Sequence, residues 1–236
     1  MVPEPNPKPS ELLTPNVRLM RHDAQLVQIV DASLADATRR AGDHLACHPG
    51  CTQCCHGAFA INPLDALRLR TAMIELNAAD PEKAAAITER AREYLVEFEE
   101  SFPGDRKTGI LGTTSEEEAA FEEFASDAPC PALNPVNGLC DLYDARPMTC
   151  RVFGPPVRMS APATPEPEIV PGSGEESGFA VCELCFINAT PEEIAAAELT
   201  VPYAEEEQLL NQMHEEMPSS AGDTIVAYCL IPTPTL

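Results

Sequence analysis

Cysteine placement constrains this chain more than any other feature of its sequence. Nine of the ten cysteines fall into three groups, the first of which lies in the stretch CHPGCTQCCHG at residues 47–57. A C-x2-C spacing lets two thiolates converge on one ion from a tight turn, and it therefore recurs at zinc sites and iron-sulfur clusters. The pattern predicts thiolate ligation of a metal. The predicted ligands are Cys47, Cys51, Cys54, Cys55, Cys130, Cys140, Cys150, Cys182 and Cys185.

Three other interpretations compete with metal ligation. Free cysteines often act as small buried hydrophobes, and this interpretation is preferred for Cys229 in the apolar run TIVAYCLI. A disulfide framework would have to accommodate an odd number of clustered cysteines, two of them adjacent. Dithiol redox chemistry would use Cys51 with Cys54, or Cys182 with Cys185. A thioredoxin-like site would have a strand before its dithiol, and none is predicted before the first pair.

The composition predicts a mainly α fold. The chain has 236 residues, of which 44% are hydrophobic and only 5% are aromatic, with no Trp. This length suffices to bury a core without help from cysteines. Ala and Leu recur at helical spacing, which indicates helices packed through small residues. We therefore expect helices around an irregular, cysteine-rich metal-binding core with little β structure.

Charge and hydropathy argue against nucleic-acid and membrane partners. Fifteen Lys and Arg against 38 Asp and Glu give a net charge of -23, which would repel a phosphate backbone. No apolar run approaches the ~18 residues that a membrane span requires. The N-terminal stretch has five prolines in its first fifteen residues and does not resemble a secretory signal. A cytoplasmic location, where thiols stay reduced, is the expectation.

Capping signals and periodicity predict where the helices lie. Proline follows a capping residue at Pro63, Pro81 and Pro191, and each pair resembles a helix start. Ser115 with Glu118 resembles a capping box. The apolar face predicted for the first helix consists of Val17, Met20, Val27, Val30, Leu34 and Ala37. Helices are expected over residues 17–41, 63–77, 81–102, 115–124 and 203–217.

The remaining segments are predicted to be irregular. A short strand or hairpin is expected over residues 138–143, and residues 154–178 are rich in proline and glycine, which predicts a flexible surface insertion. The expected organisation is a disordered Pro-rich arm over 1–16, a single cysteine-cluster metal-binding domain over 17–217, and a C-terminal tail over 218–236.

Histidines and arginines near the cysteines have possible supporting roles. His48 and His56 flank the first group and could complete a coordination sphere, but with thiolates in excess they are left out of the predicted ligand set. Arg146 and Arg151 are candidates to offset the negative charge of a site made of thiolates. For both arginines the alternative is a surface salt bridge with one of the many carboxylates.

Three stretches of the chain resemble a known family. CTQCCHG preceded by Cys47, then PCPAL, then NGLCDLYDARPMTCRVFG are similar to the YkgJ-type cysteine-cluster family, a CxxCxxCC zinc- or iron-chelating domain. The similarity covers residues 45–187 and is most specific at C-x-LY-x-x-RP-x-x-CR. The resemblance implies that the nine clustered cysteines are the family's cluster cysteines, with Cys182 and Cys185 as the later pair found in many members.

Two details qualify the resemblance. Three residues separate Cys47 from Cys51, where the family signature has two, so the role of Cys47 is less fixed than that of the others. Asp65 stands where members often have an acidic residue, and a favourable charge at a helix N-terminus also explains it.

The resemblance implies a metal-binding protein that takes zinc or iron, with an iron-sulfur cluster as one form. A flagellin lysine methylase resembles the family in its cysteine cluster. The alternative function is therefore an iron-sulfur-dependent enzyme that modifies a protein side chain or carries electrons. Against it, no glycine-rich loop for a nucleotide-derived cofactor is evident. Anaerobic purification would separate the two, because an iron-sulfur protein is brown and a zinc protein is colourless.

Overall fold

The computed structural model describes residues 15–158, 178–218 and 222–232. Over these residues the fold is mainly α, as predicted, with two small two-stranded sheets. None of the helices in the described ranges is long and apolar enough to cross a membrane. The helices are α1 (Pro15–Ala41), α2 (Pro63–Ala79), α3 (Pro81–Phe98), α4 (Ser115–Glu123), α5 (Met148–Val152), α6 (Pro191–Ala196), α7 (Tyr203–Glu216) and α8 (Val226–Cys229).

Side-chain caps start the helices where the sequence predicts them. The Asn62 side chain accepts a hydrogen bond from the backbone N–H of Asp65 at 3.0 Å, and α2 follows with Pro63 at its first position. Asp80 caps α3 in the same way, and Thr190 forms a capping box at the start of α6. These caps use donors that every helix N-terminus leaves free, so local sequence is enough to place them.

The cap of α4 lies one residue earlier than predicted. Thr114, rather than Ser115, has the extended backbone of a cap. Its side chain accepts the backbone N–H of Glu117 at 3.3 Å, and its own backbone N–H donates to the Glu117 carboxylate at 3.1 Å. Ser115 is already the first helical residue. Both pairs, Thr114 with Glu117 and Ser115 with Glu118, have the capping-box spacing, so the spacing alone does not choose between them.

Helix α1 buries most of the predicted face. Val30 and Ala37 are buried and Met20, Val27 and Leu34 are half-buried, as predicted, whereas Val17 is 48% exposed. Leu19 and Leu26, which the predicted face did not include, are also buried. Asp23 lies on the same buried face, where its carboxylate pairs with an arginine of α2. The buried face of α1 is therefore partly polar, which a purely apolar pattern does not register.

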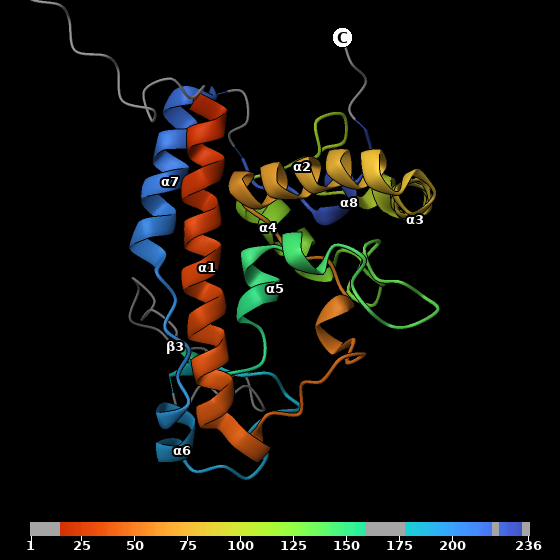
Figure 1. Cartoon of the computed structure of the whole chain (residues 1–236). Coiled ribbons are helices and arrows are strands. Elements are labelled where there is room, and N and C mark those ends of the chain that lie inside the picture. The colour runs from red at the N-terminus through yellow and green to blue at the C-terminus, as the bar shows by residue number, and fades with distance from the viewer. Residues whose placement is uncertain (1–14, 159–177, 219–221, 233–236) are drawn as a thin grey trace, which may run out of the picture.

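The helices pack in two groups. Figure 1 shows α7 running alongside α1, while α2 lies across the molecule next to α3 and α8. An apolar cluster joins α1, α2, α5 and α7 through residues such as Val30, Leu64, Met148 and Met213. A second cluster joins α2, α3 and α8 through residues such as Leu69 and Ile87. The cysteine-bearing loops lie between these packed helices.

The strands are short and antiparallel. β1 (Gly104–Asp105) pairs with β2 (Ile110–Leu111), and β3 (Val157–Arg158) pairs with β4 (Phe179–Ala180). The expected insertion over 154–178 is thus bordered by a sheet, and residues 159–177 lie outside the described residues.

The strand or hairpin predicted over residues 138–143 does not form. An isolated pairing of Leu133 with Cys140 and a 3₁₀ turn, η5 (Tyr143–Ala145), occur there instead. Prolines and glycines on both sides leave no run long enough for a ladder.

Residues 224–230 of the predicted C-terminal tail belong to the core. Ile225, Val226 and Leu230 are buried, and Thr224 exchanges backbone hydrogen bonds with Ile61 at 2.8 and 3.0 Å. The run TIVAYCLI is apolar enough to gain stability by burial, because each buried apolar side chain contributes about 1.5–3 kcal/mol. The expected arm over 1–16 lies almost wholly outside the described residues, since α1 begins at Pro15.

Candidate metal centre

Seven of the nine predicted ligands line one cavity of about 600 Å³. Its walls also include Leu69 of α2, Val226 of α8 and two arginines, Arg146 and Arg151. The cysteines that line it are Cys47, Cys51, Cys54, Cys55, Cys130, Cys140 and Cys150. All ten cysteines, which lie within the described residues, are free thiols. The fold thus brings together side chains that are about 100 residues apart in sequence.

Local backbone structure positions five of the thiols that line the cavity, those of Cys54, Cys55, Cys130, Cys140 and Cys150. Cys54 and Cys55 lie on a 3₁₀ turn, η3 (Gln53–Cys55). The N–H of Cys130 donates to the carbonyl of Cys55 at 2.8 Å, which places the second cysteine group beside the first. Cys140 follows through its pairing with Leu133, and Cys150 lies on α5.

The last two cysteines meet the start of the first group. The sulfurs of Cys47 and Cys185 lie 3.9 Å apart. Cys182 and Cys185 are buried in a small apolar cluster with the end of α1 and with α6, and the N–H of Cys185 donates to the carbonyl of Cys182. The ring of Phe186 stacks on His44, with ring centres 5.4 Å apart.

Burial raises the pKa of most of these thiols. It raises the pKa of Cys47 to about 12, with further increases from Cys185, Cys182 and Cys51. It also raises the pKa of Cys130 to about 12, although the N–H groups of Ala132 and Leu133 act in the opposite direction. The pKa values of Cys140, Cys150 and Cys182 are raised, again mainly by burial. A metal ion that bound these groups would have to displace their protons.

The adjacent pair behaves differently from the other thiols. The hydrogen bond between Cys54 and Cys55 lowers the pKa of Cys54 to about 6, and Arg146 adds to the decrease. The same hydrogen bond, together with burial, raises the pKa of Cys55. Cys54 is therefore the thiol in this group that becomes an anion most easily.

Both predicted arginines lie beside the thiols and are buried. Arg146 is 8% exposed and Arg151 is 1% exposed. Asp31 of α1 accepts two hydrogen bonds from Arg151 at 2.7 and 2.8 Å and lies 3.6 Å from Arg146. Each arginine therefore forms a salt bridge with a carboxylate, as the alternative predicted, but only the Asp31 side chain, 45% exposed, reaches the surface, while both guanidinium groups are buried at the wall of the thiol cavity. Nε of Arg151 is buried and has no hydrogen-bond partner among the described residues.

A buried ionic network supports the start of α5. Arg68 of α2 donates to Asp23 at 2.5 and 2.9 Å and to Asp65 at 2.6 Å. Asp65 also accepts the backbone N–H of Met148 at 2.9 Å, two residues before Cys150. Asp65 is 1% exposed, so it is a buried structural group as well as a helix N-terminal charge. Burial raises its pKa, although Arg68 acts in the opposite direction.

Sequence reasoning did not identify Asp23, Asp31 or Arg68. Asp23 and Asp31 are eight residues apart on α1, and Asp23 falls among the apolar residues of the buried face. Acidic residues at helical spacing within an apolar face are the signal that could have pointed to buried ionic partners.

His48 and His56 lie at the surface, and Cys229 lies in the core, as predicted for that cysteine. His48 is exposed, with Nδ1 3.0 Å from the carbonyl oxygen of Pro49, and His56 is exposed, with Nδ1 3.0 Å from that of Thr52. Cys229 is 1% exposed in the core against α2 and α3. Burial raises its pKa to about 11, as expected for a small buried hydrophobe.

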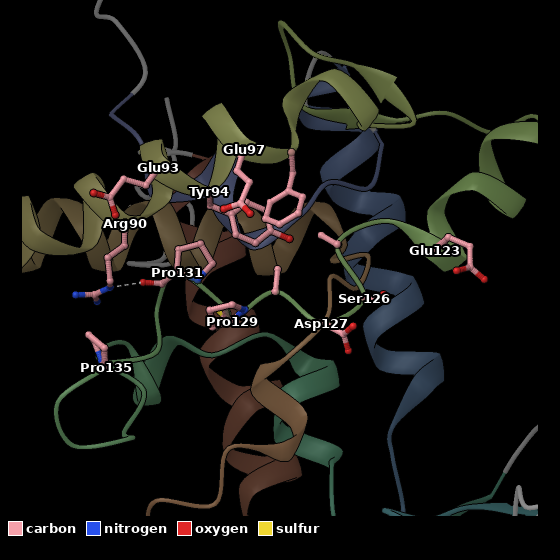
Figure 2. Close-up of a pocket in the computed structure, with 14 residues that line it drawn as sticks. Arg90, Glu93, Tyr94, Glu97, Glu123, Ser126, Asp127, Pro129, Pro131 and Pro135 are labelled. Carbon is pink, nitrogen blue, oxygen red and sulfur yellow. Dashed lines mark hydrogen bonds between the residues drawn. The ribbon is translucent and has the colours of Figure 1, made fainter.

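A second cavity, of about 740 Å³, touches the thiols only at Cys130 (Figure 2). The acidic side chains of Glu93, Glu97 and Asp127 stand along its edge, and Tyr94 lies between them in the view. Arg90 is held against the wall by its hydrogen bond to the carbonyl of Pro131 at 2.9 Å. With one cysteine, this cavity has no thiolate set of its own.

The cysteine thiols are suitable ligands for a soft metal, although the described side chains do not form a complete coordination sphere. Within the described ranges, no three His, Cys, Asp or Glu side chains are placed to hold an ion as they stand. Cysteine thiolates are the ligands that zinc and iron-sulfur centres prefer. The buried, incompletely paired guanidinium of Arg151 at the cavity wall is suited to the surplus negative charge of such thiolates.

The fold and these loops define a helical protein built around a cluster of cysteines. Residues 46–163 match the family described as "CxxCxxCC: Putative zinc- or iron-chelating domain". The match spans half of the chain, and the chain belongs to this family. No curated protein and no solved structure gave a match. The family supports metal binding, with zinc or iron as the metal.

Proposed function

We propose that the chain chelates zinc or iron through the thiolates of its nine clustered cysteines. The observation that supports this most is the gathering of seven thiols and two buried arginines around one cavity. Buried polar groups need partners, and thiols with raised pKa values in such a place lose their protons readily only to a metal. The complete ligand set is Cys47, Cys51, Cys54, Cys55, Cys130, Cys140, Cys150, Cys182 and Cys185.

Groups around the thiols favour the deprotonated, metal-binding form of the sulfur. Backbone N–H groups of Ala132 and Leu133 act on Cys130, and the N–H of Leu142 acts on Cys140. Such donors, together with Arg146 near Cys54, stabilise sulfur in its anionic form. When bound, the metal would join loops from distant parts of the chain, and its binding free energy would add to folding stability.

Metal and sulfide analysis of anaerobically prepared protein tests the proposal. Cys54→Ser and Cys150→Ser should each lower the bound metal, because each removes one thiolate from the cavity. Cys229→Ser is the matched control, since that thiol is buried away from the cavity, and its metal content should equal that of the wild type. Equal metal content in all three variants would contradict the proposal.

The alternative function is an iron-sulfur-dependent enzyme that modifies a protein side chain, in the manner of a lysine methylase, or carries electrons. The cavity of about 600 Å³ beside the thiols favours it, since chemistry at a centre requires space next to it. In that case the anaerobic protein would be brown and contain iron with acid-labile sulfide. Colourless protein with stoichiometric zinc would rule out this alternative.

A further inference from the structure

We infer that the nine thiols form two separate metal centres, one of four thiolates and one of five. The inference rests on the proposed function, since it divides the ligands of that function between two sites. The four-thiolate centre consists of Cys47, Cys51, Cys182 and Cys185. The five-thiolate centre consists of Cys54, Cys55, Cys130, Cys140 and Cys150.

The two parts of the motif CHPGCTQCCHG contact two different segments of the chain. Its first part contacts the 182–185 turn, because Cys47 and Cys185 have sulfurs 3.9 Å apart and the side-chain amide of Gln53 donates to Glu183 at 2.5 Å. The helical end just before it is tied to the same turn by the N–H of Phe186, which donates to the carbonyl of His44 at 2.7 Å.

The second part of the motif pairs with a different segment. The N–H of Cys130 donates to the carbonyl of Cys55 at 2.8 Å, and the N–H of Gly57 donates to the carbonyl of Ala128 at 2.9 Å. An isolated antiparallel bridge joins His56 with Pro129 in the same pair of segments. The 3₁₀ turn η3 lies at the division, so neighbouring cysteines of one short motif are directed to two places.

The two sets of thiols also lie in different apolar surroundings. Cys182 and Cys185 belong to a cluster with Ala41 and Ala197, at the end of α1 and beside α6. Cys130 and Cys140 pack against the cluster built by α2, α3 and α8. Cys182 and Cys185 are not among the residues that line the large cavity, whereas Cys47 and Cys51 line its edge nearest to them, where the sulfur of Cys47 lies 3.9 Å from that of Cys185. Side chains fixed in separate packed clusters cannot all reach one ion.

The separation of the Cys47 and Cys185 sulfurs suits zinc. Thiolates bound to one tetrahedral Zn²⁺ at about 2.3 Å lie ~3.8 Å apart, close to the separation of Cys47 and Cys185. Both pairs sit on tight turns, in which the N–H of Cys51 donates to the carbonyl of His48 and that of Cys185 donates to Cys182. Four thiolates fill a zinc sphere, so this centre would be closed and structural.

The five-thiolate set has the features of an open centre. It faces the cavity, and Arg146 lies near both Cys54 and Cys140. More thiolates mean more negative charge to offset, and the buried arginines are on this side.

The four-thiolate centre goes beyond the family domain. The family match ends at residue 163, whereas Cys182 and Cys185 follow it. Metal bound there would fasten the segment that resumes at Gly178 to the end of α1. It would therefore stabilise the attachment of a region that the family domain does not include.

Zinc and cobalt binding to the full chain tests the division. Two double variants are compared with the wild type, Cys47→Ser/Cys185→Ser and Cys55→Ser/Cys150→Ser, with Cys229→Ser as the control. Each double variant should lose only its own share of the zinc, and the two remaining amounts should sum to the wild-type content. Cys55→Ser/Cys150→Ser should still give the visible spectrum of tetrahedral cobalt-thiolate.

The outcomes distinguish the division from the proposed function. Wild type that binds none of zinc, cobalt and iron contradicts the proposed function itself. Wild type that binds metal, with either double variant losing all of it, means one shared centre and overturns only the division.

A test on the wild type does not depend on how the variants fold. Zinc-loaded protein is treated with a chelator and a thiol-alkylating reagent, and mass spectrometry locates the alkylated cysteines in partly demetallated molecules. Alkylation should stay within one group of four or five while the other group keeps its metal. Partly demetallated molecules with alkylation spread over both groups would overturn the division.

Discussion

Replacing Arg68 with Ala should destabilise the protein strongly. The guanidinium is 9% exposed and pairs with two carboxylates, Asp23 and Asp65, which are 3% and 2% exposed. Its removal would leave both carboxylates buried without a counter-charge. Breaking such a buried pair costs about 3–5 kcal/mol, which is a large part of the stability of a typical domain.

The measurement is thermal unfolding at neutral pH and fixed free zinc, because bound metal shifts apparent stability. For a chain of this size, 1 kcal/mol corresponds to about 2–4 °C in Tm, so Arg68→Ala should lower Tm by about 6–20 °C. Arg92→Ala is the matched control on α3. Its ion pair with Glu89 joins side chains 55% and 61% exposed, and such pairs contribute about 0–1 kcal/mol.

A charge-free version of the network separates its electrostatic part from its packing. Asp23→Asn/Arg68→Met/Asp65→Asn removes all three charges at similar volume, so it should recover part of the stability that Arg68→Ala loses. The reasoning fails if Arg68→Ala lowers Tm no more than Arg92→Ala does. It also fails if the triple variant is less stable than Arg68→Ala.

Three further predictions concern local features. Thr114→Ala should cost about 1 kcal/mol in the free energy of unfolding, whereas Ser115→Ala should cost less; the reverse order in urea titrations would place the cap of α4 where the sequence alone suggested. Gly154→Ala should lower both Tm and bound metal, because φ is +117° there and the added methyl would lie 3.0 Å from the sulfur of Cys47. Gly178→Ala, at φ +72° with no atom within 4 Å of the added methyl, should strain the backbone without loss of metal. Equal loss of bound metal in Gly154→Ala and Gly178→Ala would contradict a role for the contact with Cys47. Burial tends to raise the pKa of Asp141, but hydrogen bonds from its neighbours outweigh this and leave the pKa lowered. The stabilisation that ionised Asp141 gives the folded state is therefore fully present above the unfolded-state pKa of about 3.9, and it is lost as pH falls through the lower pKa of the folded state. Wild-type and Asp141→Asn unfolding curves should accordingly converge on acidification, and a constant gap down to low pH would refute this.

Much of the helical structure follows from local sequence. The caps at Asn62, Asp80 and Thr190 satisfy N–H groups three residues away, so each is decided within one turn of chain. The cysteine spacings are local in the same sense. At α4 the sequence predicted a cap at Ser115, and the structure has it at Thr114, because both residues have an acidic partner at the capping-box spacing.

The candidate site required long-range contacts that no local pattern contains. Cys47 meets Cys185 across 138 residues, and Arg68 meets Asp23 across 45. The apolar run at the C-terminus could have been exposed or buried, and packing against α2 and α3 decided that it is buried.

By itself, the sequence determined that nine clustered thiols are available, in a family of zinc- or iron-chelating domains. Spacing along the chain determines helices and turns because their hydrogen bonds join near neighbours. Only the tertiary structure decided which thiols face each other and which arginines lie beside them. The physical reason is that these contacts depend on how α1, α2 and α5 pack together, and that packing is a property of the whole core.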